Sequence, residues 1–503
     1  MARASARRKD KHRRIEAWRA QDPARFERLG IGAAALAELE LKLLGRVVLP
    51  GDPTYEQARQ ETNPAFQAFP QVIVYCEIEH DVELCLLAAR AYHLWVCVRA
   101  GGHSTAGYSV NSGMVIDVSG LNCVEVDVDA MTVTAGAGAD FDKLNGALNM
   151  TGLHVPSGQC GDVHIGGFVQ GGGYGYTSRC FGIQSDCVLA VRVMLANGRV
   201  VTANRDQNQD LYWAMRGGTG GNFGVLLTVT YQLYPVASVW AYSIEWPIGD
   251  APAALLEMQT NYMLTGAPKE LGATTIIGRH DSVPVLLMQG MYVGDADAGK
   301  VALDSLLHLG HHRLLVDESG PYGTMNHLLE NFPYAIPDPP AGSSEAKRAG
   351  YIKQPLLLED WQEIVDYVQL APNPNDSAVI EPYGGVINTY PEAASAFVHR
   401  DVAMDFFVDA FWSHERDMPR AIEWLDGFSA LMQPFVTGAV YQNYPQRGLP
   451  NFAAAYWGNA YSRLMQVKAK YDPDNFFHFE QSIAVGPVDP GETTPIVYER
   501  TRV

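Results

Sequence analysis

The chain has no long apolar run, little cysteine and few basic residues for its length. No stretch of about 18 uninterrupted apolar residues occurs, so we expect no transmembrane helix. The seven cysteines form an odd set without a C-x-x-C pair or a histidine at zinc-ligand spacing, which argues against a disulfide framework and a zinc centre. Lys and Arg number 37 against 56 Asp and Glu, and the net charge of -19 argues against a nucleic-acid partner.

Basic residues are nevertheless concentrated near the start of the chain, between Arg3 and Arg19. This pattern is open to three interpretations: a nucleic-acid-binding tail, a twin-arginine export signal, or the start of a helix. An export signal needs an apolar segment next, but 31–44 is interrupted by Glu38, Glu40 and Lys42 and has the spacing of an amphipathic helix. We therefore expect a cytoplasmic protein whose cysteines are reduced and mostly buried.

The length of 503 residues exceeds what one hydrophobic core usually supports, so we expect two domains or one domain with a large insertion. Apolar patterning in the first half predicts strands at 72–75, 94–99, 114–118, 123–127 and 132–135, with helices at 81–92 and 141–149. Beyond Tyr234 it predicts strands at 273–278, 283–293, 378–389 and 401–412, and helices at 251–264, 296–309, 415–432 and 456–470. The segment 337–344 is typical of an exposed loop. The fold class is α+β, with an antiparallel sheet in the second half.

Two glycine-rich segments stand out, at 99–109 and 156–175. The first follows the apolar strand 94–98, so its glycines lie where the backbone turns. Consecutive glycine N–H groups can form an anion-binding nest, and the missing side chain lets a pyrophosphate approach closely. Neither a Walker G-K-[ST] nor a G-x-G-x-x-G at a strand-to-helix turn is present. A glycine loop by itself is more often a tight turn, but two loops that each carry a nucleophile favour a cofactor site.

The nucleophiles are His103 in the first loop and Cys160 in the second. A lone histidine or cysteine is usually a surface or core residue. An imidazole nitrogen and a thiolate are, however, the two side chains best able to add to an electrophilic flavin ring. The pair therefore suggests a flavin bonded to the protein at two points.

These segments resemble FAD-linked oxidases of the berberine-bridge-enzyme type, in the vanillyl-alcohol-oxidase/p-cresol-methylhydroxylase superfamily. The resemblance covers nearly the whole chain and rests on 99–104, on the Cys160 loop ending in 171–175, on 220–225, and on 456–459 with 471–476. It implies an N-terminal helical segment at 1–65, an FAD-binding domain at 66–238 and a substrate-binding domain at 239–440. The remaining segment, 441–503, is berberine-bridge-like and returns to the FAD domain.

The resemblance also implies how FAD is held. His103 would bond the flavin 8α-methyl carbon and Cys160 the C6 carbon, which raises the flavin's reduction potential and leaves the substrate side open. The residues implied to bind the cofactor are His103, Cys160, Arg99, Gly101, Gly102, Ser104, Gly107, Gly158, Gly161, Gly166, Gly167, Gly171, Gly173, Tyr174, Gly175, Gly221, Asn222, Val225, Tyr456 and Asn459. No metal is expected.

Three further features bear on catalysis. Val163 stands three residues after Cys160, where the resembling oxidases gate oxygen, and its small side chain favours O2 as the acceptor. The segment 441–444 resembles the family's Tyr-x-Asn-Tyr, so Tyr441 or Tyr444 is the candidate base for the substrate hydroxyl. Glu381, in Glu-Pro-Tyr-Gly-Gly, resembles the strand that supplies an acidic or amide partner. The tyrosines also have a structural interpretation as core residues, and Glu381 as a solvated carboxylate on a strand.

The expected activity is O2-dependent oxidation of an alcohol to a ketone, aldehyde or lactone, with formation of H2O2. Oligosaccharide hemiacetals and natural-product alcohols are the two leading substrate classes. Three alternatives remain open: oxidative cyclisation, a dehydrogenase with a non-oxygen acceptor, and a catalytically silent flavoprotein. The expected partners are a small-molecule or oligosaccharide substrate and O2, with no nucleic acid and no membrane.

Overall fold

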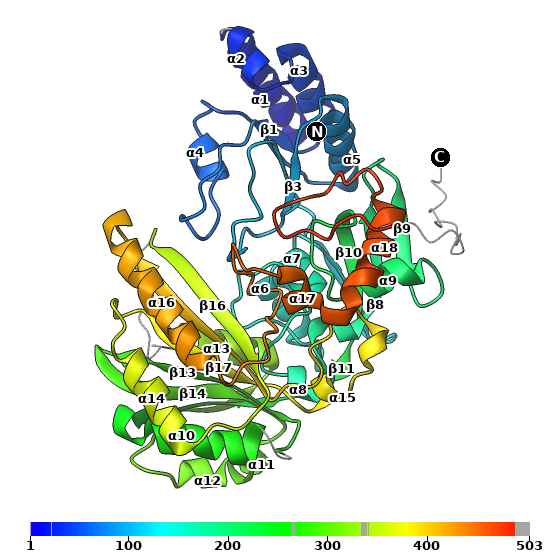
Figure 1. Ribbon diagram of the computed structural model, residues 1–503. Coiled ribbons are helices and arrows are strands. Elements are labelled where there is room, and N and C mark those ends of the chain that lie inside the picture. Colours follow the sequence, from blue (N-terminus) through cyan, green and yellow to red (C-terminus); the bar gives the residue numbers. More distant parts are fainter. Residues whose placement is uncertain (1, 22, 264–266, 333–339, 341, 488–503) are drawn as a thin grey trace.

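The computed structural model describes residues 2–21, 23–263, 267–332, 340 and 342–487. Three large sheets organise the described residues, two in the first half and one in the second (Figure 1), and the short strands β7 (Leu153–His154) and β11 (Tyr234–Pro235) form a further two-stranded sheet. Helices and antiparallel strands are mixed in the α+β manner that the sequence predicts, which confirms the fold class. Among the described residues, no helix is both long and apolar enough to cross a membrane.

The first sheet has four strands in the order β1-β2-β4-β3. Strands β2 and β3 both run parallel to β4, and β1 pairs antiparallel with β2. Helices α1, α3 and α5 pack in series beside this sheet, at the top of Figure 1. The bounds are β1 (Arg46–Val48), β2 (Val72–Tyr75), β3 (Val96–Arg99), β4 (Met114–Asp117), α1 (Ala2–Arg19), α3 (Ala33–Lys42) and α5 (Glu79–Ala91).

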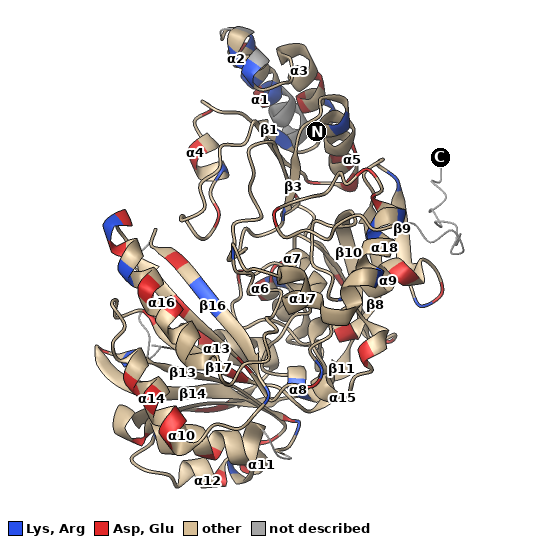
Figure 2. Cartoon of the chain, in the orientation of Figure 1, with Lys and Arg blue, Asp and Glu red and all other residues tan. Residues whose placement is uncertain are grey.

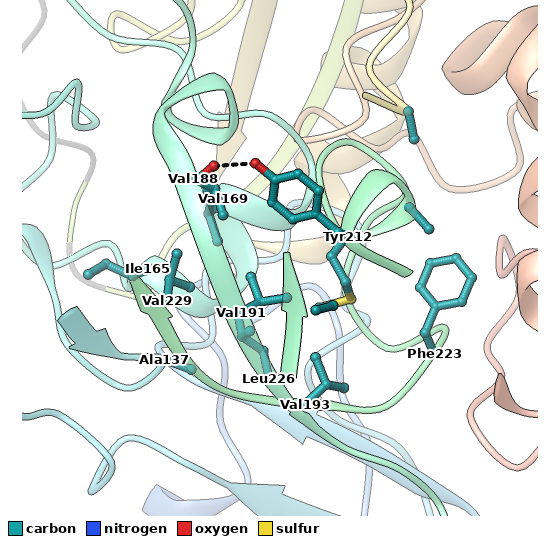
Figure 3. Close-up of a cluster of buried hydrophobic side chains, with 14 of the residues drawn as sticks. Ala137, Ile165, Val169, Val188, Val191, Val193, Tyr212, Phe223, Leu226 and Val229 are labelled. Carbon is teal, nitrogen blue, oxygen red and sulfur yellow. Dashed lines mark hydrogen bonds between the residues drawn. The ribbon is translucent and has the colours of Figure 1, made fainter. Parts of the chain in front are cut away.

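The second sheet is antiparallel, in the order β5-β6-β10-β8-β9. Strand β9 alternates half-buried and buried residues. Buried valines of the sheet pack on α7 and α9, and Tyr212 of α9 donates a hydrogen bond to the carbonyl of Val188 at 2.5 Å (Figure 3). The bounds are β5 (Val124–Asp127), β6 (Thr132–Gly136), β8 (Val188–Met194), β9 (Val200–Asn204), β10 (Val225–Gln232), α6 (Phe141–Leu148), α7 (Ile165–Gln170) and α9 (Gln209–Ala214).

The third sheet has seven antiparallel strands in the order β15-β12-β14-β13-β17-β18-β16. One face is covered by α10, α14 and α16 (Figure 1). The bounds are β12 (Val239–Pro247), β13 (Leu271–His280), β14 (Val283–Val293), β15 (Arg313–Gly320), β16 (Ser344–Ile352), β17 (Ser377–Pro382), β18 (Met404–Trp412), α10 (Ala251–Met258), α13 (Tyr322–Asn331), α14 (Leu358–Val368) and α16 (Met418–Met432).

Alternation along β18 decides which side chains face the site. Met404, Phe406 and Val408 belong to the core beneath the helices, so Asp405, Phe407 and Asp409 project from the opposite face. Charged residues also follow one another along the edge strand β16 (Figure 2). The sheet therefore presents charged and aromatic side chains on the face opposite α10, α14 and α16, where α13 covers only the part formed by β12 and β15.

The last segment packs on the first half of the chain through α17 (Phe452–Trp457) and α18 (Tyr461–Tyr471) (Figure 1). Lys468 of α18 is fully buried, forms an ion pair with Asp472 at 2.6 Å and donates to the carbonyl of Asn222 at 2.6 Å. Asn222 lies in the glycine loop before β10. A buried charge held in this way ties the end of the chain to that loop.

Several predicted elements differ from the structure. The strand predicted at 378–389 ends at Pro382, because Gly384 and Gly385 take positive φ values of 91° and 56° and a short helix, α15 (Val386–Thr389), follows. The helix predicted at 296–309 is interrupted at Leu303 between α11 (Ala296–Ala302) and α12 (Asp304–Leu307).

The helix predicted at 251–264 keeps α-geometry only to Met258 and continues as a π-turn, Gln259–Met263. Strand β16 was not predicted, and it begins at Ser344, the last residue of the predicted loop 337–344. Residues 337–339 and 341 of that loop lie outside the described residues.

Candidate active site

A cavity of about 1040 Å³ lies where both glycine loops meet the face of the third sheet opposite α10, α14 and α16. Its size is at the upper end for small-molecule and cofactor sites. The structure brings together these predicted residues as its lining: His103, Cys160, Gly101, Gly102, Ser104, Gly107, Gly158, Gly166, Gly167, Tyr174, Gly221, Tyr456, Val163, Glu381, Tyr441 and Tyr444.

The first loop leaves the carboxyl end of β3 and is fixed by a buried ion pair. Arg99 Nε lies 2.7 Å from Asp117 Oδ2 on the neighbouring parallel strand β4. Gly101 has no room for a side chain, since a Cβ there would lie 2.3 Å from Nδ1 of His164 in the second loop. The backbone of the first loop therefore packs against a side chain of the second. His103, two residues after Gly101, lines the cavity.

The second loop presents Cys160 as an exposed thiol on the same cavity. Backbone bonds shape it: Val163 donates to the Cys160 carbonyl at 3.4 Å, and Gly161 donates to the carboxylate of Glu330 at 2.8 Å. Of the seven cysteines, all within the described residues, none forms a disulfide and four are buried, as predicted. Of these seven cysteines, only Cys160 is both exposed and part of a glycine loop that lines the cavity.

The residues present fit an FAD molecule. Tyr108 and Asn111 line the cavity, and their buried Oη and Nδ2 atoms have no hydrogen-bond partner within the described chain. Buried polar atoms are normally paired, so these two are suited to a polar ligand. Backbone N–H groups at Gly102 and Ser104 can cradle a phosphate, and His103 with Cys160 offers the nucleophiles for a flavin ring.

Tyr441 is held by three donors. Its hydroxyl oxygen accepts hydrogen bonds from the backbone N–H of Gly173 at 2.8 Å and of Tyr174 at 3.1 Å, and from Asn443 Nδ2 at 2.9 Å. The side chain is buried, and burial raises its pKa despite these donors. Tyr441 is therefore fixed against the glycine loop 171–175.

Tyr444 is instead coupled to a carboxyl group. Its hydroxyl donates to Oε2 of Glu381 at 3.1 Å, and its ring lies edge-on to Tyr441 at 5.0 Å between centroids. Gln159 Nε2 donates to Oε1 of Glu381 at 3.2 Å and to Thr274 Oγ1 at 2.6 Å. Burial raises the pKa of Glu381 to about 7, so this carboxyl can exchange a proton near neutral pH.

A second charged group lies beside Tyr444. Lys347 of β16 forms an ion pair with Asp409 at 2.5 Å, and its Nζ lies 5.3 Å from the centroid of the Tyr444 ring. Burial alone would lower the pKa of Lys347, but Asp409 and Glu345 outweigh it and raise the pKa. Burial raises the pKa of Asp409 to about 7. The site thus places one ammonium group among carboxyl groups that titrate near neutrality.

Asp405 extends this cluster on the same strand as Asp409. It is opposite Glu381 in the sheet register, fully buried, and neither carboxyl oxygen has a hydrogen-bond partner within the described chain. Burial and the neighbouring Glu381 both raise its pKa.

Eight of the proposed cofactor residues lie outside the cavity lining. Arg99 faces Asp117, Val225 is buried in the core, and Asn459 donates to Glu392 at the surface. The others shape the loops behind the lining. Asn222 donates its side-chain amide to the Gly218 carbonyl, and a Cβ would lie within 3.0 Å of a neighbouring residue at Gly161, Gly171, Gly173 and Gly175.

The sequence did not single out Gln159, Lys347, Asp405 or Asp409. Two signals were available: Gln159 precedes Cys160, and acidic residues at 405 and 409 recur on one face of a predicted strand. Lys347 had no such signal, because the strand that carries it was not predicted.

The nucleophile-bearing glycine loops and the cavity that they line fit a flavin-linked oxidoreductase. Two family models match the chain, one described as FAD binding domain over 70–204 and one as Berberine and berberine like over 440–484. These matches support a berberine-bridge-enzyme-like FAD-linked oxidoreductase of the p-cresol-methylhydroxylase-type superfamily.

Individual relatives agree over most of the length. An uncharacterized FAD-linked oxidoreductase of Bacillus subtilis, YgaK, is 28% identical over 461 residues, covering 88% of this chain and 97% of the relative. The monolignol oxidoreductase AtBBE-like 13 of Arabidopsis thaliana is 27% identical over 451 residues, covering 82% and 84%. The structure of Physcomitrella patens BBE-like 1 superimposes with a TM-score of 0.82 at 26% identity, covering 90% of this chain and 99% of that one.

Proposed function

We propose that the protein is an oxidase that takes a hydride from an alcohol carbon and a proton from its hydroxyl, giving a carbonyl product and H2O2. The observation that carries the proposal is the Tyr444–Glu381 hydrogen bond of 3.1 Å inside the cavity that His103 and Cys160 line. Bound FAD, bonded to His103 and Cys160, supplies the hydride acceptor. The proposed proton acceptor, Tyr444 with Glu381, and the proposed flavin attachment residues thus line the same cavity.

Within this proposal the residues of the chain handle the proton. The Tyr444 hydroxyl accepts the substrate proton as it passes its own to Glu381. Gln159 fixes the other oxygen of Glu381 and so keeps the acceptor aimed at the tyrosine. Lys347, 5.3 Å from the ring centroid, stabilises negative charge that develops on the phenol.

We further propose that 66–238 and 441–503 together bind FAD and that 239–440 binds the substrate. Aromatic side chains, Phe407 and Tyr444 with ring centroids 4.8 Å apart, line the substrate face of the cavity. Together with the relative named for monolignols, these rings favour a natural-product alcohol over an oligosaccharide hemiacetal. Val163 on the cavity wall supports O2 as the acceptor.

The test is flavin bleaching under nitrogen with a panel of aromatic allylic alcohols, aliphatic alcohols and oligosaccharides, followed by admission of air. We expect bleaching with members of the first class, return of the oxidised spectrum in air, and one equivalent of H2O2 per turnover. If the flavin bleached but no H2O2 formed in air, the electron acceptor would be a compound other than O2. No bleaching with any alcohol would overturn the proposed reaction.

A further inference from the structure

The two glycine loops meet at a side-chain contact between His103 and Asp162. Nε2 of His103 lies 3.4 Å from Oδ2 of Asp162, two residues beyond Cys160. His103 is 26% exposed on the cavity wall, whereas the Asp162 side chain is 74% exposed. An ion pair this exposed contributes little to stability. We therefore consider how the Asp162 carboxylate affects the protonation of the His103 imidazole.

A carboxylate beside one imidazole nitrogen decides which nitrogen carries the proton. The nitrogen that faces the carboxylate keeps its hydrogen as a donor, which leaves the lone pair on the other nitrogen. The hydrogen bond from His103 lowers the pKa of Asp162, so the carboxylate stays charged at neutral pH. His103 is thereby held with N–H at Nε2 and a nucleophilic Nδ1.

We infer that Asp162 is a positioning residue for covalent attachment of the flavin to His103 through Nδ1. This inference rests on the proposed attachment of FAD at His103 and Cys160. The new bond joins Nδ1 to the 8α-carbon of the flavin, which loses one hydrogen from its methyl group, while His103 loses the hydrogen on Nε2 to Asp162. Two electrons and these two hydrogens pass to O2, which becomes H2O2, so atoms and electrons balance.

The neighbours of Asp162 fit this role. Nδ1 of His164 is 3.0 Å from the main-chain carbonyl of Asp162, which fixes the loop at this residue. His164 also lowers the pKa of Asp162, whereas Glu330 on α13 faces the same loop as a like charge. The main chain of Asp162 is thus fixed by His164, and its side-chain carboxylate contacts His103.

The experiment uses the Cys160→Ala variant, in which only the histidyl bond would hold the flavin. Asp162→Asn and Asp162→Glu are added to this background, and each protein is purified with its flavin and precipitated in acid. We expect Cys160→Ala to retain its flavin in the pellet, Asp162→Asn to release most of it, and Asp162→Glu to restore retention. Mass spectrometry of the flavopeptide should place the bond on His103, and NMR spectroscopy of the same peptide should place it on Nδ1.

The matched control is Asp304→Asn in the same background. Asp304 lies 3.3 Å from Nδ1 of His308 and is 73% exposed, so it repeats the contact away from the cavity. It should leave retention unchanged, and melting curves confirm folding. Equal retention with and without Asp162, or a bond at Nε2, would overturn the inference while leaving the attachment intact. Complete release by Cys160→Ala alone would overturn the proposed histidyl bond itself.

Discussion

The Tyr444 hydroxyl lies 3.1 Å from Oε2 of Glu381, although the two residues are 63 positions apart. Tyr444 comes from the C-terminal segment and Glu381 from the end of β17 in the substrate sheet. The same segment carries Tyr441 to the glycine loop at 173–174. The Tyr444–Glu381 pair, which we propose as the proton acceptor, therefore forms only when the last segment packs between the sheet and the glycine loops.

Replacing Tyr444 by Phe should slow flavin reduction while leaving the flavin bound. A positioned acid–base group contributes about 10²–10⁴-fold, so a fall of that order is expected in anaerobic stopped-flow bleaching. Tyr441→Phe is the matched control. Its hydroxyl accepts from two backbone N–H groups, so its loss should disturb the loop and the flavin spectrum more than the proton step. An unchanged reduction rate in Tyr444→Phe would remove it as the base.

The rate of flavin reduction should rise with pH through about 7. Glu381 accepts the proton in its ionised form, and burial raises its pKa to about 7. Asp409 titrates in the same range, so Glu381→Gln must be compared with Asp409→Asn. For Glu381→Gln we expect a low rate of flavin reduction that does not change with pH. For Asp409→Asn we expect the rate still to rise with pH, but with a shifted midpoint. If the reduction rate of Glu381→Gln still rose with pH as in the wild type, a group other than Glu381 would be responsible for the pH dependence.

The same pKa shift predicts a stability effect. The folded-state pKa of Glu381 lies above its ordinary value, so the folded protein binds this proton more tightly than the unfolded chain. Its stabilising contribution is complete below the unfolded pKa near 4.5 and is lost as pH rises through about 7. Glu381→Gln should therefore gain melting temperature relative to wild type at pH 8 but not at pH 4. An equal difference at both pH values would contradict the raised pKa.

The site could be predicted from the sequence only where a local rule applied. The 99–109 and 156–175 loops are recognisable because glycine is required where backbones approach closely, as at Gly101 against His164. Strand β18 was predicted from alternation, but its acidic face was not connected with the site. Lys347 was missed because the edge strand β16 begins with the charged residues Glu345, Lys347 and Arg348 among small ones and so has no apolar signature. The partners of Glu381 depend on strand order, which no local pattern encodes.

Single variants of the two attachment residues should each keep the flavin covalently bound. His103→Ala leaves the thioether and Cys160→Ala leaves the histidyl bond, so only the double variant should release its flavin in acid. The measurement is the absorbance of the supernatant against that of the pellet, with the thermal melt as a folding control. Free FAD released from the wild-type protein would contradict both bonds.

Lys468 should be the cation whose loss most weakens the packing of the C-terminal segment. It is fully buried, and Lys468→Met keeps its volume but leaves Asp472 buried without its partner. Breaking a buried pair in this way costs about 3–5 kcal/mol in the free energy of unfolding. The control is Lys300→Met, which removes an exposed pair with Asp317 of nearly the same length, 2.7 Å, and should cost less than about 1 kcal/mol. Equal melting temperatures for the two variants would contradict this assignment.

Val163→Leu should separate the two half-reactions. The backbone of Val163 is fixed on both sides, with its N–H on the Cys160 carbonyl and its carbonyl accepting from Phe141 at 3.2 Å, so a larger side chain cannot withdraw by moving the loop. The added methylene must occupy space at the cavity wall that Val163 lines. We expect reoxidation by O2 to slow at least about tenfold, or about 1.4 kcal/mol of activation free energy, while anaerobic reduction by substrate stays within about twofold. Val163→Ala should leave reoxidation as fast as in wild type. If Val163→Leu slowed both half-reactions equally, the residue would shape the substrate site, and access of O2 would have to be controlled elsewhere.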